Sequence, residues 1–337
     1  MMVQAMAVDQ SGRGLSPCTY ELSPLKPDEV LIKVSHCGVC RGDLRVFRSH
    51  GSDDSEIFVP GHEIIGHVVG RGADVSILAP GDRVGVGWQC GSCQRCDWCQ
   101  QGEPELCPTQ EETCINRPGG FATHIKVQAE FAVPIPVEIQ SFHAAALLCG
   151  GLAVFSPLKR YGLKPKSRVG VVGVGGLGHM ALQFCRVLGF HTLAFSTSPK
   201  KSADTRELGA DEFVHLSDQL AVKRVESSCD FILSTSCGHL DWRQLLRILR
   251  PGGTLCLVGV TTSEVHLPVS DLIDERKTVA GSPIGSPKTL RTLLQFVCQH
   301  KLRPWTECFR MSNASEAIAR LQSRQLRYRA VLEQNLQ

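Results

Sequence analysis

The sequence predicts an α/β protein with two domains, one mostly β and one containing a doubly wound parallel sheet. A chain of 337 residues is about two domains long. Residues 1 to about 150 are rich in Gly and Pro and carry short alternating apolar segments between turn signals, such as EVLIKVSHCG. From about residue 153, apolar strand patterns alternate with helical patterns, which indicates βαβ units and a parallel sheet covered on both faces.

The elements of the second region follow one another in order along the chain. RVGVVGV (168–174) and HTLAFS (191–196) are strand patterns, and GHMALQFCRVLG (178–189) between them is helical. The same alternation returns later as CDFILST (229–235), the helical WRQLLRILRPGG (242–253) and TLCLVGV (254–260). The last fifty residues carry further helices and a closing strand, which we expect to return to the first domain.

Composition argues against several classes of protein. The net charge is +3 and the pI is about 8.1, with no basic stripe and interleaved aromatics, so we expect no nucleic-acid partner. The N-terminal sequence lacks the features of a secretory signal, and no run approaches the roughly 18 uninterrupted apolar residues of a membrane span. The expectation is a cytoplasmic protein with no membrane partner.

The segment CGSCQRCDWCQQGEPELC (90–107) contains five cysteines in eighteen residues, out of sixteen in the chain. Four of them fit C-x2-C-x2-C-x7-C, and these are Cys93, Cys96, Cys99 and Cys107. Four thiolates around one tetrahedral ion leave no open position, so the pattern predicts a structural metal. A disulfide framework is disfavoured, because a chain this long with 42% hydrophobic residues can form a stable core without disulfide bonds. Spacing alone leaves open whether Cys107 or Cys90 is the fourth ligand.

A glycine-rich turn follows the first strand of the second region. VVGVGGLGHM places Gly173, Gly175 and Gly178 as G-x-G-x-x-G between a strand and a helix. The first glycine permits the tight turn, the second lets a pyrophosphate approach the backbone, and the third lets helix and strand pack closely. Because the motif has this strand–turn–helix context, it predicts a dinucleotide site rather than a merely glycine-rich turn.

The residues after HTLAFS indicate which dinucleotide binds. An NAD site usually has Asp or Glu here, which accepts from the ribose 2′-hydroxyl. This chain instead has Ser196, Thr197 and Ser198, then Pro199, Lys200 and Lys201. Hydroxyls and an ammonium can bind a 2′-phosphate that a carboxylate would repel, so we expect NADP(H). A helix N-cap at Ser198 with Pro199 at N1 explains the same residues, and both explanations can hold at once.

Three further residues suggest a second metal: Cys40 in CGVCRGD, His62 in PGHEIIG and Cys149 in LLCGGLAVF. Each alone is more often a buried core residue, and their spacing does not join them.

The whole chain resembles the zinc-dependent medium-chain dehydrogenases/reductases, in the branch of cinnamyl-alcohol-dehydrogenase-like enzymes and bacterial NADP-dependent aldehyde reductases. The motifs that carry the resemblance occur in the expected order over almost the full length: CGVCRGD, PGHEIIGHVV, GDRVGVGW, the cysteine segment, GGFATH, ALLCGGLAVFSPL, VGVGGLGHMALQ, STSPKK, ELGAD and RYRAVL. The resemblance implies a GroES-like β domain, residues 1–152 and 286–337, that carries a zinc lobe at 88–110. It implies a Rossmann domain at 153–285 and a homodimer formed through that domain.

The resemblance also implies roles for individual residues. Cys93, Cys96, Cys99 and Cys107 match structural-zinc ligands, which leaves Cys90 out. Cys40, His62 and Cys149 match catalytic-zinc ligands, Glu63 matches an acid that transiently ligates that zinc, and Asp43 matches the carboxylate that orients the ligand histidine. The positions that match the cofactor site are Gly173, Gly175, Gly176, Leu177 and Gly178 at the pyrophosphate, and Ser196, Thr197, Ser198 and Lys201 at the 2′-phosphate.

The implied reaction is hydride transfer between NADP(H) and an alcohol or aldehyde, with two zinc ions per chain. One alternative is NADPH-dependent reduction of a conjugated double bond, and another is a non-catalytic zinc- and NADPH-binding partner or sensor. Trp88 and Ile284 are candidates for an apolar substrate pocket, although core packing explains such residues equally well.

Gly42 departs from the family, which usually has Ser or Thr there to pass the substrate's proton toward solvent. Arg45 replaces a relay histidine of many relatives, and His50 lies nearby in sequence. We expect a water to fill the space at Gly42 and carbonyl reduction to persist at a reduced rate, so that Gly42→Ser raises turnover.

Overall fold

The computed structural model describes residues 1–9, 14–44, 57–260 and 264–336. The chain divides into two compact units. Unit 1 comprises Met1–Cys149 and Gly285–Gln337, and unit 2 comprises Gly150–Ile284. The three ligand candidates Cys40, His62 and Cys149 all belong to unit 1, whereas the glycine-rich turn belongs to unit 2.

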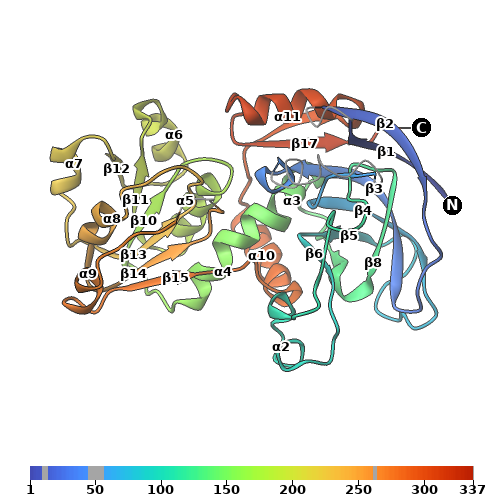
Figure 1. Cartoon of the computed structure of the whole chain (residues 1–337), viewed down its shortest axis with the longest axis horizontal. Coiled ribbons are helices and arrows are strands. Elements are labelled where there is room, and N and C mark those ends of the chain that lie inside the picture. Colours follow the sequence, from blue (N-terminus) through green and yellow to red (C-terminus); the bar gives the residue numbers. More distant parts are fainter. Residues whose placement is uncertain (10–13, 45–56, 261–263, 337) are drawn as a thin grey trace. The chain divides into compact units, whose positions relative to one another are not determined.

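Unit 2 is built on a six-stranded sheet in which every neighbouring pair of strands is parallel (Figure 1). Across the sheet the strands are β12 (Glu212–His215), β11 (His191–Ser196), β10 (Arg168–Val172), β13 (Cys229–Ser234), β14 (Leu249–Leu257) and β15 (Thr278–Gly281). Chain order along this sheet is 3-2-1-4-5-6, which is the doubly wound order of dinucleotide-binding folds. The order reverses beside β10, so a ligand is expected at the carboxyl end of that strand.

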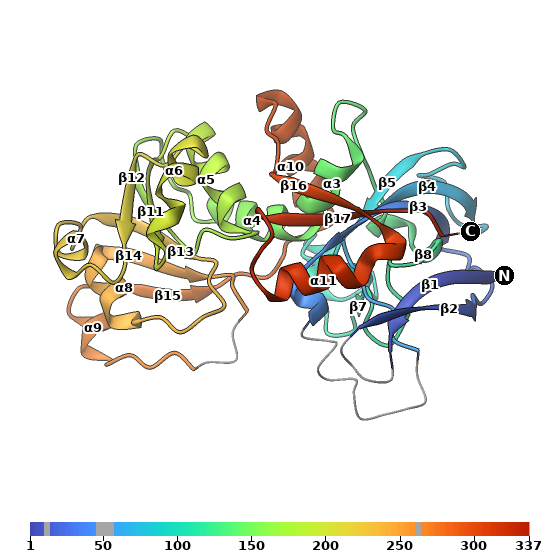
Figure 2. The same cartoon turned by 90° about the horizontal axis from the view of Figure 1, so that it is seen from above.

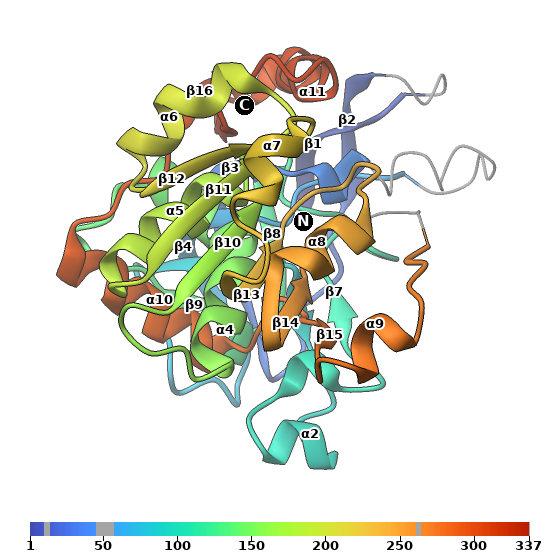
Figure 3. The same cartoon turned by 90° about the vertical axis from the view of Figure 1, so that its left-hand side faces the viewer.

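Helices cover both faces of this sheet, as Figure 3 shows. They are α4 (Leu152–Arg160), α5 (Gly178–Val187), η4 (Pro199–Lys201), α6 (Ser202–Glu207), α7 (Gln219–Lys223), α8 (Trp242–Ile248) and α9 (Ser270–Ile273). Right-handed crossovers place α5 and α6 on one face and α7 and α8 on the other. The strands are buried between the helices, with Leu193, Phe195, Ile232 and Leu255 at or below 1% exposure in one core cluster.

One helix of unit 2 is shorter in the structure than the sequence pattern predicts. The helical pattern over 242–253 stops at Ile248, and β14 starts directly at Leu249. Pro251 lacks the N–H group that a continuing helix needs, and Gly252 has a positive φ of 76°. The strand register shifts between the pairs Cys229–Leu249 and Phe231–Thr254, so this segment is an irregular start of the strand.

Unit 1 contains a seven-stranded sheet that joins the two ends of the chain (Figure 2). Its strands are β16 (Thr306–Arg310), β17 (Arg329–Glu333), β3 (Glu29–Val39), β4 (Ile64–Arg71), β5 (Arg83–Val86) and β9 (Val133–Pro134), with β8 (His124–Gln128) paired to β3. The C-terminal strand β17 lies antiparallel to β3, with Val331 opposite Gly38. The closing strand therefore returns to the first region, as the sequence predicts.

Smaller elements complete unit 1. They are the paired strands β1 (Met2–Val8) and β2 (Leu15–Glu21), the pair β6 (Gln89–Gly91) and β7 (Glu111–Glu112), and the helices α2 (Asp97–Gln100), η1 (Pro104–Leu106), η2 (Ala129–Phe131), α3 (Ser141–Ala146), α10 (Pro287–His300), η5 (Met311–Asn313) and α11 (Ala314–Gln322). A buried core lies against the sheet and includes Ile32, Ile64 and Phe121. Residues 41–44 are helical and directly follow Cys40 at the end of β3.

One continuous helical segment, Ser141–Arg160, is long and apolar enough by composition to cross a membrane, with a mean hydropathy of 1.5. It comprises α3, the π-helical turn η3 (Leu147–Gly151) and α4. In the fold 67% of this stretch is buried, as in the core helix of a globular protein. We therefore interpret it as a core helix.

Candidate active site

Asp43 makes hydrogen bonds to two of the predicted metal ligands, Cys40 and His62. Its side chain is fully buried, and Oδ2 accepts a hydrogen bond of 2.9 Å from the backbone N–H of Cys40. Oδ1 lies 2.9 Å from Nδ1 of His62 and accepts from the backbone N–H of Gly61 at 3.1 Å. The carboxylate can only accept at these contacts, so Nδ1 of His62 carries the proton and Nε2 has its lone pair free for a ligand.

His62 shows most directly that the site suits a metal. The side chain is 0% exposed, yet Nε2 has no hydrogen-bond partner in the described part of the chain. A buried nitrogen lone pair without a partner is costly, and a metal ion would satisfy it. Burial lowers the pKa of His62, but the negative charges of Asp43, Cys149 and Cys40 outweigh burial and raise the pKa well above its usual value, so that Nε2 would take up a proton wherever no metal holds its lone pair.

The two cysteines meet at the spacing expected of two zinc thiolates. The sulfur atoms of Cys40 and Cys149 lie 4.0 Å apart. Zn–S bonds of about 2.3 Å in a tetrahedral site place two sulfurs about 3.8 Å apart. The contact with Cys149 holds the pKa of Cys40 well below its ordinary value, while the pKa of Cys149 is raised by the same contact and by burial. Cys149 lies in the π-helical turn, a local geometry that often occurs at functional sites.

Glu63 completes this group, and its partner is a residue that the sequence analysis did not single out. The ligand atoms of Cys40, His62, Glu63 and Cys149 all lie within 4.8 Å of one another. Glu63 is fully buried, Oε1 accepts a hydrogen bond from Nη2 of Arg329 on β17, and Oε2 has no partner among the described residues. Burial raises the pKa of Glu63 to about 7, against the opposing effect of Arg329.

The structure shows what surrounds Gly42. Its φ is not in the left-handed region, so the backbone there does not require glycine. A Cβ atom at this position would lie 3.0 Å from Cε1 of His62 and 3.5 Å from Cζ3 of Trp88. The His62 ring would therefore have to give way by a few tenths of an ångström, whereas the approach to Trp88 is an ordinary contact, and the gain of turnover in Gly42→Ser stays a prediction. Arg45 and His50 lie outside the described residues.

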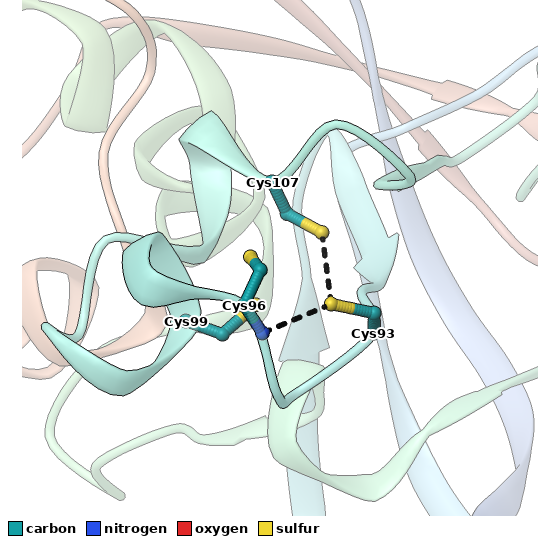
Figure 4. A group of neighbouring side chains, drawn as sticks. All are labelled: Cys93, Cys96, Cys99 and Cys107. Carbon is teal, nitrogen blue, oxygen red and sulfur yellow. Dashed lines mark hydrogen bonds between the residues drawn. The ribbon is translucent and has the colours of Figure 1, made fainter.

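The four cysteines predicted to hold a structural metal also come together. Figure 4 shows that the side chains of Cys93, Cys96, Cys99 and Cys107 converge, and their sulfur atoms all lie within 4.8 Å of one another. The sulfurs of Cys107 and Cys93 are 3.5 Å apart, and backbone N–H groups of Arg95 and Cys96 lower the pKa of Cys93 to about 6. Four sulfurs this close together suit a tetrahedral ion.

Cys90, the fifth cysteine of this segment, has other contacts. Its side chain is 0% exposed, its sulfur lies 3.4 Å from the carbonyl oxygen of Glu111, and Arg117 donates to the sulfur at 3.2 Å. Burial raises the pKa of Cys90 to about 11, which disfavours the thiolate that a metal ligand needs. Cys90 and the cysteines of both metal groups are free thiols in the structure.

The glycine-rich turn of unit 2 has the local geometry of a phosphate-binding turn. Gly173 follows β10 with a φ of +87°, which favours glycine. A Cβ at Gly175 would meet open space, whereas a Cβ at Gly178 would collide with the carbonyl oxygen of Gly173. Glycine is thus required by conformation at the first position and by helix–strand packing at the third, and the second leaves the backbone open to a ligand. Gly176 and Leu177 lie between them and are half-buried.

The residues expected at a 2′-phosphate lie directly after β11. The side chain of Ser196 is nearly buried and accepts from the backbone N–H of Ser198 at 3.1 Å, while Thr197 is exposed. Ser198 occupies the N-cap position of η4 with Pro199 next to it, but its side chain makes no cap hydrogen bond. Lys201 ends η4 and is half-buried.

Sequence reasoning assigned no role to two residues that lie close to the proposed metal ligands. It gave a third, Trp88, only as a candidate for a substrate pocket. Arg329 lies in the motif RYRAVL, to which no site role was assigned, and the buried Cys114, whose thiol lies close to His62 and Asp43, lies in none of the motifs. Cys114 has a positive φ of 64°, which is unusual for a residue other than glycine. Trp88 packs edge-on against His62 with ring centroids 4.8 Å apart. Ile284, the other pocket candidate, is half-buried in unit 2, and its carbonyl accepts from Ser156 Oγ at 2.7 Å.

A doubly wound dinucleotide-type sheet together with two separate groups of metal-binding side chains defines the class of a zinc-dependent dehydrogenase. Two family models match the chain: the alcohol dehydrogenase GroES-like domain over residues 26–137 and the zinc-binding dehydrogenase domain over residues 176–299.

Similar proteins span the chain almost completely. An aldehyde reductase, AdhA, from Synechocystis sp. is 37% identical and covers 98% of each chain. Cinnamyl alcohol dehydrogenase 5 from Arabidopsis thaliana is 36% identical over 97% of this chain and 94% of its own. A solved cinnamyl alcohol dehydrogenase from Sorghum bicolor is 33% identical, with a TM-score of 0.94, over 99% of this chain and 98% of its own. The chain therefore belongs to the zinc-dependent medium-chain dehydrogenase/reductase family, in the branch of the cinnamyl alcohol dehydrogenases.

Proposed function

We propose that this enzyme reduces aldehydes with NADPH, and reversibly oxidises the corresponding alcohols, at a zinc ion held by Cys40, His62 and Cys149. The observation that carries the proposal is the buried, unpartnered Nε2 of His62 beside two sulfurs that are 4.0 Å apart. Two thiolates and one imidazole leave a zinc ion one open position, where it polarises a carbonyl oxygen or lowers the pKa of an alcohol.

The protein's own groups prepare this site. Asp43 fixes the tautomer of His62 and, through the backbone N–H of Cys40, also the position of one thiolate. Glu63 supplies a fourth potential ligand: its Oε1 accepts from Arg329, and its Oε2 has no hydrogen-bond partner among the residues that the structure describes. We assign Glu63 the role of a transient ligand that occupies the metal when substrate is absent.

The second proposed metal is a structural zinc at Cys93, Cys96, Cys99 and Cys107. Four sulfurs saturate a tetrahedral ion, so this zinc takes no part in the reaction. Its contribution is to fold the segment 88–110, where the described elements α2 and η1 are only one turn each.

We assign the cofactor to unit 2, within the range 153–285. The proposed pyrophosphate site is the turn Gly173–Gly178, and the 2′-phosphate site contains Ser196, Thr197, Ser198 and Lys201. No carboxylate follows β11 within this segment, which favours NADP(H) over NAD(H). A cinnamyl alcohol dehydrogenase from Helicobacter pylori, solved in complex with NADP(H), is 27% identical with a TM-score of 0.90, over 99% of this chain and 98% of its own.

We further propose a cytoplasmic homodimer. The free thiols of the two metal groups need a reducing compartment to remain ligands. For the dimer, β15 is an edge strand of the parallel sheet, and Val260, Val269 and Ile273 near it in sequence are each more than 60% exposed. An open edge strand with apolar neighbours is suited to pairing with a second copy about a twofold axis.

The test combines metal analysis with a substrate panel. Purified protein should contain two zinc ions per chain and oxidise NADPH in the presence of aliphatic, aromatic or α,β-unsaturated aldehydes. The panel should include compounds with a conjugated double bond but no reducible carbonyl. Product analysis then shows whether hydride reached the carbonyl carbon or the double bond.

One observation supports the second candidate, NADPH-dependent reduction of a conjugated double bond. Gly42 offers no hydroxyl beside the ligand group, so the usual side-chain path for a substrate proton is missing. If the enzyme converts none of the aldehydes and alcohols but reduces conjugated double bonds, this candidate function replaces the first. A protein that binds zinc and NADPH but consumes no cofactor with any compound would instead support a non-catalytic partner or sensor role.

A further inference from the structure

Two carbonyl groups of the glycine-rich turn accept hydrogen bonds from side chains that are not part of the turn. The hydroxyl of Thr235 donates to the carbonyl oxygen of Gly173 at 2.6 Å and lies 3.1 Å from that of Val172. Nδ1 of His179 lies 3.2 Å from the carbonyl oxygen of Gly175. A carbonyl can only accept, so this nitrogen of His179 carries the proton. Both side chains are buried.

Each of these hydrogen bonds also orients the peptide N–H group that follows. In a planar trans peptide, the C=O of one residue and the N–H of the next point in opposite directions. The bond from Thr235 therefore orients the N–H of Val174, and the bond from His179 orients the N–H of Gly176. Glycine populates many backbone conformations, so without these bonds the peptide groups of the turn would be free to rotate.

The turn offers donors that the protein itself does not use. Among the described residues, no group accepts a hydrogen bond from the backbone N–H of Gly175, Gly176 or Leu177. Gly175 is exposed, and a Cβ there would meet open space. Backbone N–H groups at the start of a helix suit an anion such as a pyrophosphate, whereas a carbonyl turned to the same side would repel it.

The position of Thr235 is itself well determined. Its backbone N–H donates to the carbonyl of Val172 at 2.9 Å, next to the pairing of β13 with β10. A Cβ at Gly259 would collide with the backbone of Thr235 and Ser236, and a Cβ at Gly173 would lie 3.1 Å from the backbone nitrogen of Ser236. The segment after β13 is thus packed between the turn and the residues that follow β14, and it supports the turn rigidly.

We propose that Thr235 and His179 are positioning residues for the pyrophosphate turn. They hold the carbonyl groups of Gly173 and Gly175 away from the phosphates, so that the neighbouring N–H groups are oriented before the cofactor arrives. A preorganised turn binds more tightly because less conformational entropy is lost on binding. The inference rests on the proposed cofactor site in unit 2, and it adds two residues from outside the G-x-G-x-x-G motif.

The experiment measures the dissociation constant of NADPH by fluorescence titration of the full-length, zinc-loaded protein. Thr235→Val removes the hydroxyl from a side chain of nearly the same shape, and Thr235→Ser restores it. His179→Leu and His179→Asn form a second pair, in which asparagine keeps a donor nitrogen near the position of Nδ1. Thr192→Val is the matched control, because Thr192 is likewise buried and its hydroxyl donates to the carbonyl of Phe190, but it lies at the amino end of β11.

A second ligand separates the turn from the rest of the cofactor site. Adenosine 2′-phosphate carries the 2′-phosphate but no pyrophosphate, and its affinity is measured by competition with NADPH in the same variants. This ligand does not extend to the turn, so its dissociation constant should be the same in every variant. General damage to unit 2 would instead weaken the binding of both ligands.

The expected results follow from the two hydrogen bonds. Thr235→Val raises the dissociation constant of NADPH about 3- to 10-fold, the change that corresponds to the net contribution of one hydrogen bond. Thr235→Ser binds NADPH nearly as tightly as wild type. His179→Leu weakens NADPH binding to a similar extent, and His179→Asn recovers part of the loss. Thr192→Val behaves as wild type.

Three results overturn the inference. They are a Thr235→Val or His179→Leu protein that binds NADPH as wild type does, a Thr235→Ser protein as weak as Thr235→Val, and an equal loss of affinity for adenosine 2′-phosphate. Failure of the proposed function looks different. If wild type prefers NADH, the assignment of NADP(H) is wrong, and the role of Thr235 is then tested by the dissociation constant of NADH in the same variants. A wild-type protein that binds neither dinucleotide refutes the cofactor site and this inference together.

Discussion

Loss of one partner of the buried ion pair between Arg329 and Glu63 should strongly destabilise unit 1. Both side chains are almost completely enclosed, with 4% and 0% exposure, and Nε of Arg329 has no partner among the described residues. Arg329→Met removes the cation but keeps an unbranched side chain of similar length. The carboxyl of Glu63 is then left buried without its ion-pair partner.

The size of the effect follows from this burial. Removal of one partner of a buried ion pair costs about 3–5 kcal/mol, because the remaining charge is desolvated and unpaired. In a unit of roughly 200 residues, 1 kcal/mol corresponds to about 2–4 °C in Tm. We therefore expect Arg329→Met to lower the Tm of the transition that includes unit 1 by about 6–20 °C.

The assay is thermal unfolding at neutral pH with zinc in excess, followed by circular dichroism and by calorimetry. Arg243→Met is the matched control, since Arg243 pairs with Asp271 at 3.0 Å but is 58% exposed. Exposed pairs contribute about 0.2–1 kcal/mol, so this control should change the Tm by no more than about 4 °C.

A double variant tests the cause. Arg329→Met combined with Glu63→Leu removes both charges, and a buried pair replaced by apolar groups of similar size is often close to neutral in stability. We expect the Tm of the double variant to lie much closer to that of wild type than the Tm of Arg329→Met does. If Arg329→Met alone unfolds at the wild-type temperature, or if the double variant is less stable than either single variant, the reasoning about this pair is wrong.

Three further predictions concern the metals and the cofactor. Cys96→Ser should damage folding, whereas Cys149→Ser should remove one exchangeable zinc and activity from a folded protein; a single zinc in fully active wild type, measured by metal analysis, would contradict this. Wild type should bind NADPH more tightly than NADH, and Ser196→Asp should shift preference toward NADH by repelling the 2′-phosphate and offering an acceptor to the ribose; equal dissociation constants for the two cofactors in wild type would refute it. Gly178→Ala should lower both Tm and NADPH affinity because a Cβ collides with the backbone of Gly173, while Gly175→Ala should weaken NADPH binding at unchanged Tm; a shared drop in Tm would show that Gly175 is also a packing residue.

Local sequence patterns were sufficient to predict the features that form within one short segment of the chain. The C-x2-C-x2-C-x7-C spacing brings four sulfurs together because α2 and η1 fold the intervening residues into single turns. The same holds for the glycine-rich turn, where Gly173 needs its positive φ and Gly178 needs its missing Cβ. In each case the function of a residue is determined by neighbours fewer than about fifteen positions away.

The second metal group was predictable only through the family resemblance, because its members meet through the sheet and not along the chain. Cys40 follows β3, His62 precedes β4, and Cys149 lies in a helical turn more than a hundred residues from Cys40. Steric relations were also hidden from the sequence. Nothing in CGVCRGD reveals that Cε1 of His62 lies 3.0 Å from the position of a Cβ at Gly42.

Arg329 shows how strand register determines the composition of this site. β17 pairs antiparallel to β3 with Ala330 opposite Val39, so the next residue toward the start of β17, Arg329, comes level with Cys40. Side chains alternate between the two faces of a strand, and a slip of one residue would turn Arg329 away and leave Glu63 without its cation. The strand pairing thus places Arg329 beside Glu63, 266 positions away in sequence, and it is the reason that the C-terminal strand contributes to a site whose other members all precede residue 150. A truncation that removes β17 should therefore destabilise the protein by more than the loss of the strand's own hydrogen bonds. It also leaves the Glu63 carboxylate, beside the proposed zinc, exposed or without its cation.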